Sequence, residues 1–415
     1  MSGVRNSKAM HYDVVIVGSG HAGAQAAAML RQQKFEGSIA IVGEEREEPY
    51  ERPPLSKEFL LGEKSFERLA LKPSTFWADR EIHLLLGQKV VGLQTDVHVV
   101  ITAQGLNLSY GKLVWAAGGA ARRLTCRGYD FTGVHAVRTI EDVSAIALRL
   151  PFVENIVIIG GGYIGLETAA VFRKLGKSVV VLETQERVLA RVAGEPLSRF
   201  YEAQHRAHGV DVRLNATVDS IQARDGIVTG VRLAEGDILP AQLVIVGIGI
   251  VPSVQLLLDA GADGGNGVQV DEFCRTNIVD VYAIGDCASH KNRYAEGREI
   301  RLESVQNAND QAMTVAKVIT GNMEPYQAVP WFWSHQYDLH LQTIGLSIGY
   351  DDLVVRGEPE TKSFSVVYLR QGRVIALDCV NATKDFVQGK ALVVAAMKPD
   401  RDKLRDPNIA LKELI

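Results

Sequence analysis

The sequence predicts an α/β fold with two Rossmann-like units, followed by a C-terminal α+β domain. A run of branched apolar residues enters a Gly-x-Gly-x-x-Gly loop within Val14–Gly23, and the same pattern returns at Ile156–Gly165. From Tyr326 onward, shorter alternating apolar stretches predict strands, and no further glycine-rich loop occurs. Because the chain has 415 residues, it is long enough to form two or three hydrophobic cores.

Composition narrows the classes of protein that need to be considered. The formal net charge of −4 gives no basic excess that would indicate nucleic acid as a partner. No run of 18 apolar residues predicts a membrane span, and residues 1–11 look like a short leader rather than a signal peptide. The four cysteines are far apart and form no C-x-x-C pair, so we expect a cytoplasmic protein without disulfides or a metal site.

The first glycine-rich loop predicts a site for the pyrophosphate of a dinucleotide. Its three glycines allow a tight turn, close approach of the backbone to phosphates, and packing of the helix on the strand. The free N–H groups at the helix N-terminus then favour an anion. A second strand, Ser38–Gly43, leads to Glu44, whose carboxylate is placed to accept hydrogen bonds from ribose hydroxyls. The glycines are Gly18, Gly20 and Gly23.

The second copy of this pattern is complete as well, and two copies are far more specific than one. Its helix is expected over Leu166–Leu175, and its second strand, Ser178–Leu182, leads to Glu183. A carboxylate at this position binds a free 2′-hydroxyl and repels a 2′-phosphate, which favours NAD over NADP. Arg187 and Arg191 lie nearby and keep some use of NADP open. The glycines are Gly160, Gly162 and Gly165.

Between the two copies lies a rigid segment, Glu51–Lys57, that carries two cations. Its two prolines restrict the backbone and hold Arg52 and Lys57 close behind the first loop. We expect Ser56 to cap a helix that follows. The alternative interpretation is an ordinary proline-rich surface turn.

Two later strands end on residues that suit a ligand crevice. Leu113–Gly119 ends on small residues, and the strand Val281–Ile284 runs into Gly285 and Asp286. An acid at the C-terminal end of a parallel strand faces the crevice of a doubly wound sheet, although Asp286 could instead cap a helix. A helix is expected over Ser304–Ile319.

These patterns predict a discontinuous first domain, a second domain inserted into it, and a third at the C-terminus. The first comprises residues 1–118 and 248–325, the second residues 119–247, and the third residues 326–415. In the third domain we expect strands over Leu339–Ile344, Ser363–Tyr368 and Val374–Leu377, and a closing helix over Asp385–Met397.

Four sequence motifs together resemble a known family. They are E-R-P-P-L-S-K at Glu51–Lys57, G-G-G-Y-I-G-L-E at Gly160–Glu167, G-D-C-A at Gly285–Ala288 and P-W-F-W-S-H-Q at Pro330–Gln336. The chain resembles the FAD-dependent, NADH-linked ferredoxin reductases of bacterial oxygenase systems, which include putidaredoxin reductase and the reductases of aromatic-ring dioxygenases. The resemblance covers the chain from about Tyr12 onward and implies a glutathione-reductase-like fold.

The resemblance implies that the first loop binds FAD and the second binds NADH. Such a flavoprotein takes hydride from NADH and passes electrons singly to a [2Fe–2S] ferredoxin, which serves a P450 or a Rieske dioxygenase. The implied FAD contacts are Gly18, Gly20, Ala22, Gly23, Glu44, Arg52, Lys57, Val90, Arg138, Asp286, Val305 and Trp333. The implied NAD contacts are Gly160, Gly162, Tyr163, Ile164, Gly165, Glu167, Glu183 and Gly249.

The resemblance also implies roles for Lys57, Glu167 and Trp333 in the reaction. Lys57 and Glu167 meet near flavin N5, where Lys57 stabilises negative charge, and Trp333 lies against the flavin. One departure from the family is His335, which stands where W-S-D-Q has an aspartate. An acidic ferredoxin calls for a basic docking patch. The candidates in this chain are Lys398, Arg401, Lys403 and Arg405.

Other activities remain as alternatives at this point. Disulfide and peroxide reductases of similar build need a redox cysteine near residues 51–57, yet the chain has none before Cys126, and Cys287 is expected to be a core residue. A rubredoxin or monodehydroascorbate reductase would use the same flavin chemistry. An NADH-sensing flavoprotein similar to apoptosis-inducing factor is a non-enzymatic alternative. The sequence leaves monomer and dimer both open.

Overall fold

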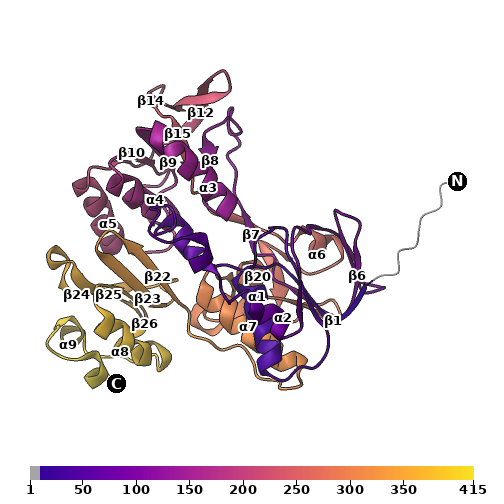
Figure 1. The fold of residues 1–415 in the computed structure, drawn as a ribbon. Helices are drawn as coiled ribbons and strands as arrows, with labels where there is room; N and C mark the ends of the chain where they lie inside the picture. Colours follow the sequence, from indigo (N-terminus) through magenta and orange to yellow (C-terminus); the bar gives the residue numbers. More distant parts are fainter. Residues whose placement is uncertain (1–9) are drawn as a thin grey trace. The chain divides into compact units, whose positions relative to one another are not determined.

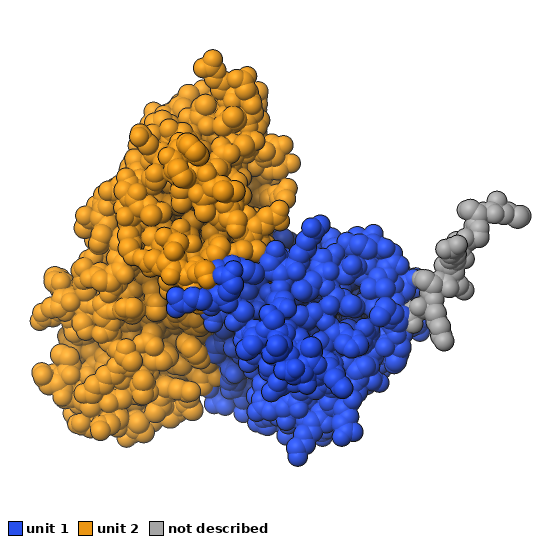
Figure 2. All heavy atoms as spheres, viewed as in Figure 1, with its two compact units in different colours: residues 1–51, 66–120, 251–328 blue, residues 52–65, 121–250, 329–415 orange. Residues whose placement is uncertain are grey.

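The computed structural model describes residues 10–415 (Figure 1). The expected leader falls mostly outside these residues, and its last two, Met10 and His11, belong to the first strand instead. None of the helices in residues 10–415 is both long and apolar enough to cross a membrane. The chain forms two compact units, shown in blue and orange in Figure 2. Unit 1 comprises residues 1–51, 66–120 and 251–328, and unit 2 comprises residues 52–65, 121–250 and 329–415.

Unit 1 is built on a seven-stranded sheet with the order β3-β2-β1-β6-β5-β4, in which β19 also pairs with β6. Strands β1, β2, β3, β6 and β19 run parallel, whereas β4, β5 and β6 form an antiparallel meander. The buried runs of Val and Ile suit strands that are covered on both faces. The strands are β1 (Met10–Val17), β2 (Ile39–Val42), β3 (Ile82–Leu85), β4 (Val90–Gln94), β5 (Val99–Thr102), β6 (Asn107–Trp115) and β19 (Val281–Ala283).

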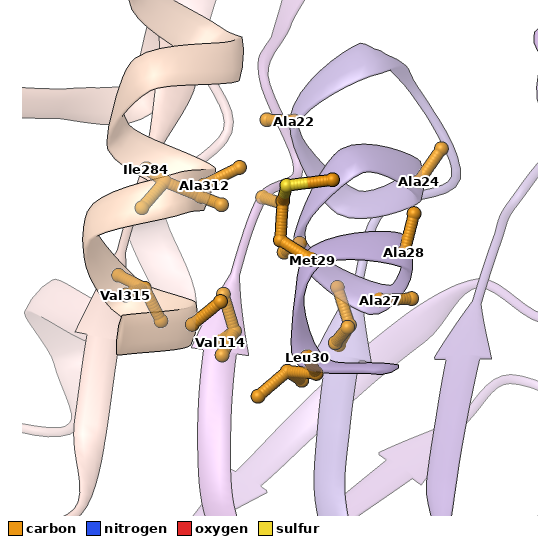
Figure 3. Close-up of a cluster of buried hydrophobic side chains, with 14 of the residues drawn as sticks. Ala22, Ala24, Ala27, Ala28, Met29, Leu30, Val114, Ile284, Ala312 and Val315 are labelled. Atoms are coloured by element: carbon orange, nitrogen blue, oxygen red, sulfur yellow. The ribbon is translucent and has the colours of Figure 1, made fainter. Parts of the chain in front are cut away.

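Two helices pack side by side over this sheet, α1 (His21–Gln32) and α7 (Val305–Ile319). Alanines on both helices let the backbones approach closely, with Met29 and Leu30 filling the space above Val114 (Figure 3). This close packing fixes the start of α1 at the end of β1, where the first glycine-rich loop lies.

The rest of unit 1 consists of short elements. A four-stranded sheet has the order β17-β18-β20-β21. The elements are α2 (Thr75–Asp79), α6 (Gln255–Asp259), β17 (Gly264–Gly265), β18 (Gly267–Val270), β20 (Ala288–Asn292), β21 (Arg298–Arg301) and the 3₁₀ turns η2 (Phe66–Leu69), η4 (Gly285–Cys287) and η5 (Arg293–Ala295). The chain passes between the units at β7 (Gly119–Ala121) and β16 (Ile250–Pro252), which pair with each other.

The first part of unit 2 is a parallel sheet with the order β11-β10-β9-β15-β8, together with an antiparallel sheet, β12-β13-β14. The strands are β8 (Val134–His135), β9 (Asn155–Ile159), β10 (Ser178–Leu182), β11 (Asp211–Arg213), β12 (Val218–Arg224), β13 (Ile227–Leu233), β14 (Ile238–Pro240) and β15 (Leu243–Val246). The helices are η1 (Pro53–Ser56), α3 (Ile140–Arg149), η3 (Leu150–Phe152), α4 (Tyr163–Lys174) and α5 (Glu195–Ala207).

The second part of unit 2 is an antiparallel sheet with the order β22-β23-β26-β25-β24. Its strands are β22 (Trp331–Gln336), β23 (Leu339–Gly345), β24 (Asp352–Glu358), β25 (Ser363–Arg370) and β26 (Arg373–Val380). Its helices are η6 (Pro359–Thr361), α8 (Thr383–Val394), α9 (Arg401–Arg405) and η7 (Leu411–Leu414). The sequence predicted β23, β25, β26 and α8 in nearly these places but missed β22 and β24.

A buried guanidinium fastens the C-terminal segment to this sheet. Arg356 on β24 is 3% exposed and pairs with Asp385 of α8 at 2.9 Å. Its other N–H groups donate to backbone oxygens of the last segment, including Asp406 at 2.6 Å and Ile409 at 2.7 Å. Arginine suits this position because its five donors lie in one plane and it stays charged when buried.

We expect Arg356→Leu to loosen residues 401–415. The substitution leaves Asp385 without its cation and several buried or partly buried carbonyl groups without donors, which costs about 3–5 kcal/mol. Amide hydrogen exchange should therefore become much faster in this segment, while β9 and β10 keep their protection. Arg373→Leu, which removes an exposed arginine of β26, is the matched control. Equal protection of residues 401–415 in both variants would contradict this account.

Candidate active site

The first glycine-rich loop has no room for side chains at two of its glycines. Gly18 has φ +113°, and a Cβ atom there would lie 2.2 Å from the backbone oxygen of Ala116. A Cβ atom on Gly23 would lie 1.9 Å from the oxygen of Gly18. The loop therefore packs backbone against backbone, as the sequence predicted, and α1 begins directly behind it.

The second loop repeats this packing and leaves one position open. A Cβ atom on Gly165 would lie 2.0 Å from the oxygen of Gly160, which itself has φ +111°. In contrast, a Cβ atom on Gly162 would meet nothing within 4 Å. The backbone at Gly162 is thus accessible at the start of α4, where a pyrophosphate is expected to approach.

The helices behind the two loops start without a side-chain cap, unlike two other helices of the chain. α3 begins with a capping box from Thr139, and α7 is capped by the hydroxyl of Ser304. At α1 and α4 the N-cap residue is glycine, and neither helix has an acidic residue in its first turn. Both starts therefore suit an anion. This arrangement fits the pyrophosphate groups of FAD and NAD.

The two acids that follow the loops differ in their surroundings. Glu44, at the end of β2, is exposed and pairs with Lys89 at 2.8 Å. Glu183, at the end of β10, is 8% exposed and accepts the backbone N–H groups of Gly161 at 2.8 Å and Gln185 at 2.9 Å. Glu183 thus braces its own glycine-rich loop, a role that the sequence did not indicate.

The central feature of unit 2 is a buried ion pair between Lys57 and Glu167, with a distance of 2.5 Å from Nζ to Oε2. Glu167 lies on α4 and is 2% exposed, and the Lys57 side chain is 14% exposed. Ser56 donates to the same carboxylate oxygen at 2.7 Å, and Ser334 donates to the other at 2.7 Å. The structure therefore brings together two of the three residues for which the family resemblance implied catalytic roles.

Ser56 differs from its prediction. It ends the 3₁₀ turn η1, and residues 57–62 form turns rather than a helix, so Ser56 caps nothing. Its hydroxyl donates to Glu167 instead, because a buried carboxylate needs hydrogen-bond donors. Neither Ser56 nor Ser334 was predicted to contact Glu167, although both lie within the motifs that carry the family resemblance.

Alternation along β22 separates two sets of side chains. Phe332 contacts Tyr163 of α4 with ring centroids 4.7 Å apart, and Ser334 on the same face contacts Glu167. On the opposite face lie Trp333, which is half-buried, and His335, which is exposed. The third predicted catalytic residue, Trp333, is thus one position away from the side chain that holds Glu167.

His335 forms a cross-strand pair with His340 of β23, with ring centroids 4.5 Å apart. Partial burial lowers the pKa of His335, and the His340 ring and the Lys57 cation lower it further. The imidazole is therefore neutral near pH 7, where the related motif has an anionic aspartate.

The remaining predicted contacts lie at the ends of elements. In unit 1, Val90 begins β4, Ala22 and Gly20 lie at the start of α1, Asp286 lies in η4, and Val305 begins α7. In unit 2, Arg52 donates to the backbone oxygen of Arg138 at 2.7 Å, Ile164 lies in the first turn of α4, and Gly249 has φ +97°.

A further buried acid, Asp378 on β26, had no predicted role. It is 5% exposed and accepts a hydrogen bond from the hydroxyl of Tyr368 at 2.5 Å. The Tyr368 oxygen in turn accepts the N–H of Gly194, which caps α5, at 2.9 Å. Burial raises the pKa of Asp378 to about 7. The only sequence signal is a carboxylate inside an apolar strand.

The cysteines show no sign of disulfide chemistry. All four are free thiols. Cys287, beside Asp286, is fully buried, and burial raises its pKa to about 12, so it is the core residue that the sequence predicted.

Comparison with known proteins decides the family. Residues 12–312 match the family described as pyridine nucleotide-disulphide oxidoreductase, which is well over half of the chain. The chain belongs to this family. Residues 331–415 match a second family, described as reductase C-terminal. The family resemblance and the fold class predicted from sequence are both confirmed.

Relatives match the chain over nearly its whole length. The 5,5′-dehydrodivanillate O-demethylase ferredoxin reductase subunit of Sphingobium sp. is 60% identical over 405 residues, which cover 97% of this chain and 98% of that protein. A ferredoxin–NAD(P)(+) reductase of Sphingomonas sp. is 57% identical over 406 residues, 98% of both chains. The crystal structure of the covalent putidaredoxin reductase–putidaredoxin complex aligns with a TM-score of 0.93 and 39% identity, and covers 97% of both chains.

The raised pKa of Asp378 predicts a pH dependence of stability. The unfolded chain loses this proton near 3.8 and the folded chain near 7, so the folded state binds more protons between these values. The free energy of unfolding should fall as the pH rises from about 4 to about 7, by up to roughly 1.4 kcal/mol per pH unit, and level off above. Asp378→Asn should remove this component in denaturant titrations.

Asp351→Asn, which changes an exposed aspartate in the same sheet region, is the control. The difference between each variant and the parent protein isolates one carboxylate. Parallel stability curves for Asp378→Asn and the parent protein between pH 4 and pH 7 would refute the assignment.

Proposed function

We propose that this chain is an FAD-dependent NADH:ferredoxin oxidoreductase that supplies electrons to an oxygenase system. The observation that carries the proposal is its agreement, over 97–98% of its length, with relatives named as ferredoxin reductases. The electron acceptor is a [2Fe–2S] ferredoxin, in keeping with the putidaredoxin complex among the structural relatives. When bound, the flavin takes hydride from NADH at N5 and releases the electrons one at a time.

Two glycine-rich loops would hold the two cofactors. The loop at Gly18–Gly23, in a domain of residues 1–118 and 248–325, would bind FAD, with Glu44 at the ribose. The loop at Gly160–Gly165, in a domain of residues 119–247, would bind NADH. The uncapped starts of α1 and α4 support both assignments, since each offers backbone N–H groups to a pyrophosphate.

Lys57 would supply positive charge where hydride arrives at the flavin. Its ion pair with Glu167 and its hydrogen bond to the oxygen of Pro53 at 3.1 Å hold the ammonium in one place. A fixed charge stabilises a developing anion without reorganisation during the reaction. Glu167 would orient Lys57, and Trp333 would cover the ring system from residues 326–415.

Glu183 supports NADH as the electron donor. Its carboxylate is fixed by backbone N–H groups at the end of β10, so it cannot easily turn away from an incoming 2′-phosphate. Repulsion between a held carboxylate and a phosphate disfavours NADPH.

The acceptor would approach a surface that attracts an acidic protein. Lys398, Arg401, Lys403 and Arg405 remain the candidates, although Arg401 already pairs with Asp352. The neutral His335 would remove a repulsive charge that an aspartate would bring. Four unpaired thiols support a cytoplasmic location.

Rapid-mixing experiments test the proposed activity directly. NADH should bleach the flavin absorbance, and addition of a [2Fe–2S] ferredoxin should then restore it with reduction of the iron–sulfur centre. Rubredoxin serves as the competing acceptor, because rubredoxin reductases are also among the relatives. Fast bleaching by NADH without electron transfer to any iron–sulfur protein would rule the proposal out.

Lys57→Met should slow flavin reduction by about 10²-fold, which is typical for the loss of one fixed electrostatic group. The flavin content of the purified protein should remain close to normal. Lys362→Met, which removes a surface lysine paired with Asp338, should leave the rate unchanged. If Lys57→Met reduced its flavin as fast as the parent protein, Lys57 would have no part in hydride transfer.

Glu183→Gln should shift the preference for kcat/KM from NADH toward NADPH by about tenfold, equivalent to about 1.4 kcal/mol. The amide keeps an acceptor for the loop but removes the negative charge. Glu186→Gln is the control, because Glu186 is exposed and lies three residues further on. An unchanged ratio in Glu183→Gln would show that this carboxylate does not select the cofactor.

A further inference from the structure

A chain of hydrogen bonds begins at Oε1 of Glu167, the carboxylate oxygen that is not paired with Lys57. Ser334 donates to Oε1 of Glu167 at 2.7 Å, and the amide nitrogen of Gln336 donates to Oγ of Ser334 at 3.2 Å. Both residues lie on β22, two positions apart, and therefore on the same face of the strand. Both are fully or almost fully buried, at 0% and 1% exposed.

The chain continues from β22 into α5. Nε2 of His205 lies 2.8 Å from Oε1 of Gln336, and the hydroxyl of Tyr337 lies 2.9 Å from Nδ1 of His205. His205 is 0% exposed, whereas Tyr337 is half-buried. Four hydrogen bonds, three of them buried and the last partly buried, thus connect a carboxylate of α4 with Tyr337.

The charge on Glu167 fixes the direction of every bond in this chain. An ionised carboxylate can only accept, so the Ser334 hydroxyl donates to it and uses its own lone pair for the Gln336 N–H. The carbonyl of Gln336 then faces His205, which requires a proton on Nε2 of the imidazole. Nδ1 is left as the acceptor for the Tyr337 hydroxyl.

If the side chain at position 167 carried no charge, as in Glu167→Gln, the same chain could reverse. The side-chain amide would donate to Ser334, the Gln336 amide would turn over, and His205 would carry its proton on Nδ1. Each reversed bond requires its neighbour to reverse as well, because every group in the chain both donates and accepts. The acceptor-only carboxylate of Glu167 is therefore tied to one of the two neutral forms of His205.

Burial keeps His205 neutral, as this coupling requires. Its removal from water lowers the pKa of His205 to about 4, and nearby His208 lowers it further, whereas the bond to Gln336 opposes the shift. Other titratable groups face the two ends of the chain. They are Lys57, His335, Tyr163 and Tyr201 near Glu167, Asp378 near Tyr163 and Tyr201, and His208 and Tyr337 at His205.

We propose that His205 is a positioning residue which, through Gln336 and Ser334, holds the Glu167 carboxylate turned toward Lys57. The inference rests on the proposed function for the importance of the Lys57–Glu167 pair in hydride transfer. It extends the site to α5, a helix that carries no part of either glycine-rich loop. Neither His205 nor Tyr337 belongs to a motif that the sequence singled out.

The tautomer of His205 can be measured without any electron acceptor. Protein labelled with ¹⁵N-histidine should show, at pH 7, a neutral His205 with its proton on Nε2, and this state should persist down to about pH 5. In Glu167→Gln the new amide can donate to Ser334 while its oxygen faces Lys57, so the proton should move to Nδ1. A charged His205 at pH 7, or an Nδ1 proton in the parent protein, would overturn the proposal.

The hydride-transfer rate tests the effect on the reaction. In His205→Asn the NADH-to-flavin hydride-transfer rate should fall about tenfold, because Gln336 and Ser334 no longer hold Glu167 turned toward Lys57. Ser334→Ala should lower the rate as well, because it removes the donor to Glu167 itself. His208→Asn is the matched control: its ring stacks on Tyr337 at 3.7 Å, but its Nδ1 faces the oxygen of Gln204, outside the chain.

Tyr337→Phe keeps the test decisive if His205→Asn does not fold. It removes only the last donor and retains the ring, so the Nδ1 resonance of His205 should shift while the Nε2 proton stays. Equal hydride-transfer rates for folded His205→Asn and the parent protein would overturn the proposal. The NMR measurement does not depend on ferredoxin reduction. Failure of the proposed function can therefore be distinguished from failure of this inference.

Discussion

A carboxylate that is buried away from water needs partners that replace the lost hydration, and Glu167 obtains three of them from two distant segments of the chain. The cation comes from Lys57 beside a proline-rich turn, one hydroxyl from the same turn, and another from the first strand of the C-terminal sheet. The geometry of unit 2 around α4 follows from this requirement. Segment 52–65 clusters with unit 2 although the residues on both sides of it belong to unit 1.

The need of Glu167 for hydrogen-bond donors also explains why the two faces of β22 carry different side chains. Phe332, Ser334 and Gln336 lie on one face of this strand and contact helices α4 and α5. Trp333 and His335 lie on the other face. A strand with aromatic side chains on both faces lacks the polar–apolar alternation of a half-buried strand, and for this reason it was missed in the sequence.

Elements that neighbouring residues determine were predicted well from the sequence, whereas contacts between residues far apart in the sequence were not. The glycine-rich loops, α1, α4 and β10 could be predicted because a few neighbouring residues determine them. The pairing of Lys57 with Glu167 came from family resemblance. The partners of Glu167 lie 111 and 167 residues away, and His205 meets Gln336 across 131 residues, so no spacing rule could join them. Ser56 was wrongly taken as a helix cap because its true partner is equally remote.

Because Glu167 accepts a hydrogen bond from the C-terminal sheet, this sheet is not freely exchangeable between such reductases. The C-terminal sheet is a separate family domain and looks like an exchangeable module, yet it contributes a hydroxyl to Glu167 and an amide to His205. A chimera that joins the first 328 residues to a foreign C-terminal sheet would preserve both glycine-rich loops and still disturb the ion pair between Lys57 and Glu167. Grafts should therefore carry matched residues at 205, 334 and 336, and natural sequence variation at these three positions should be correlated.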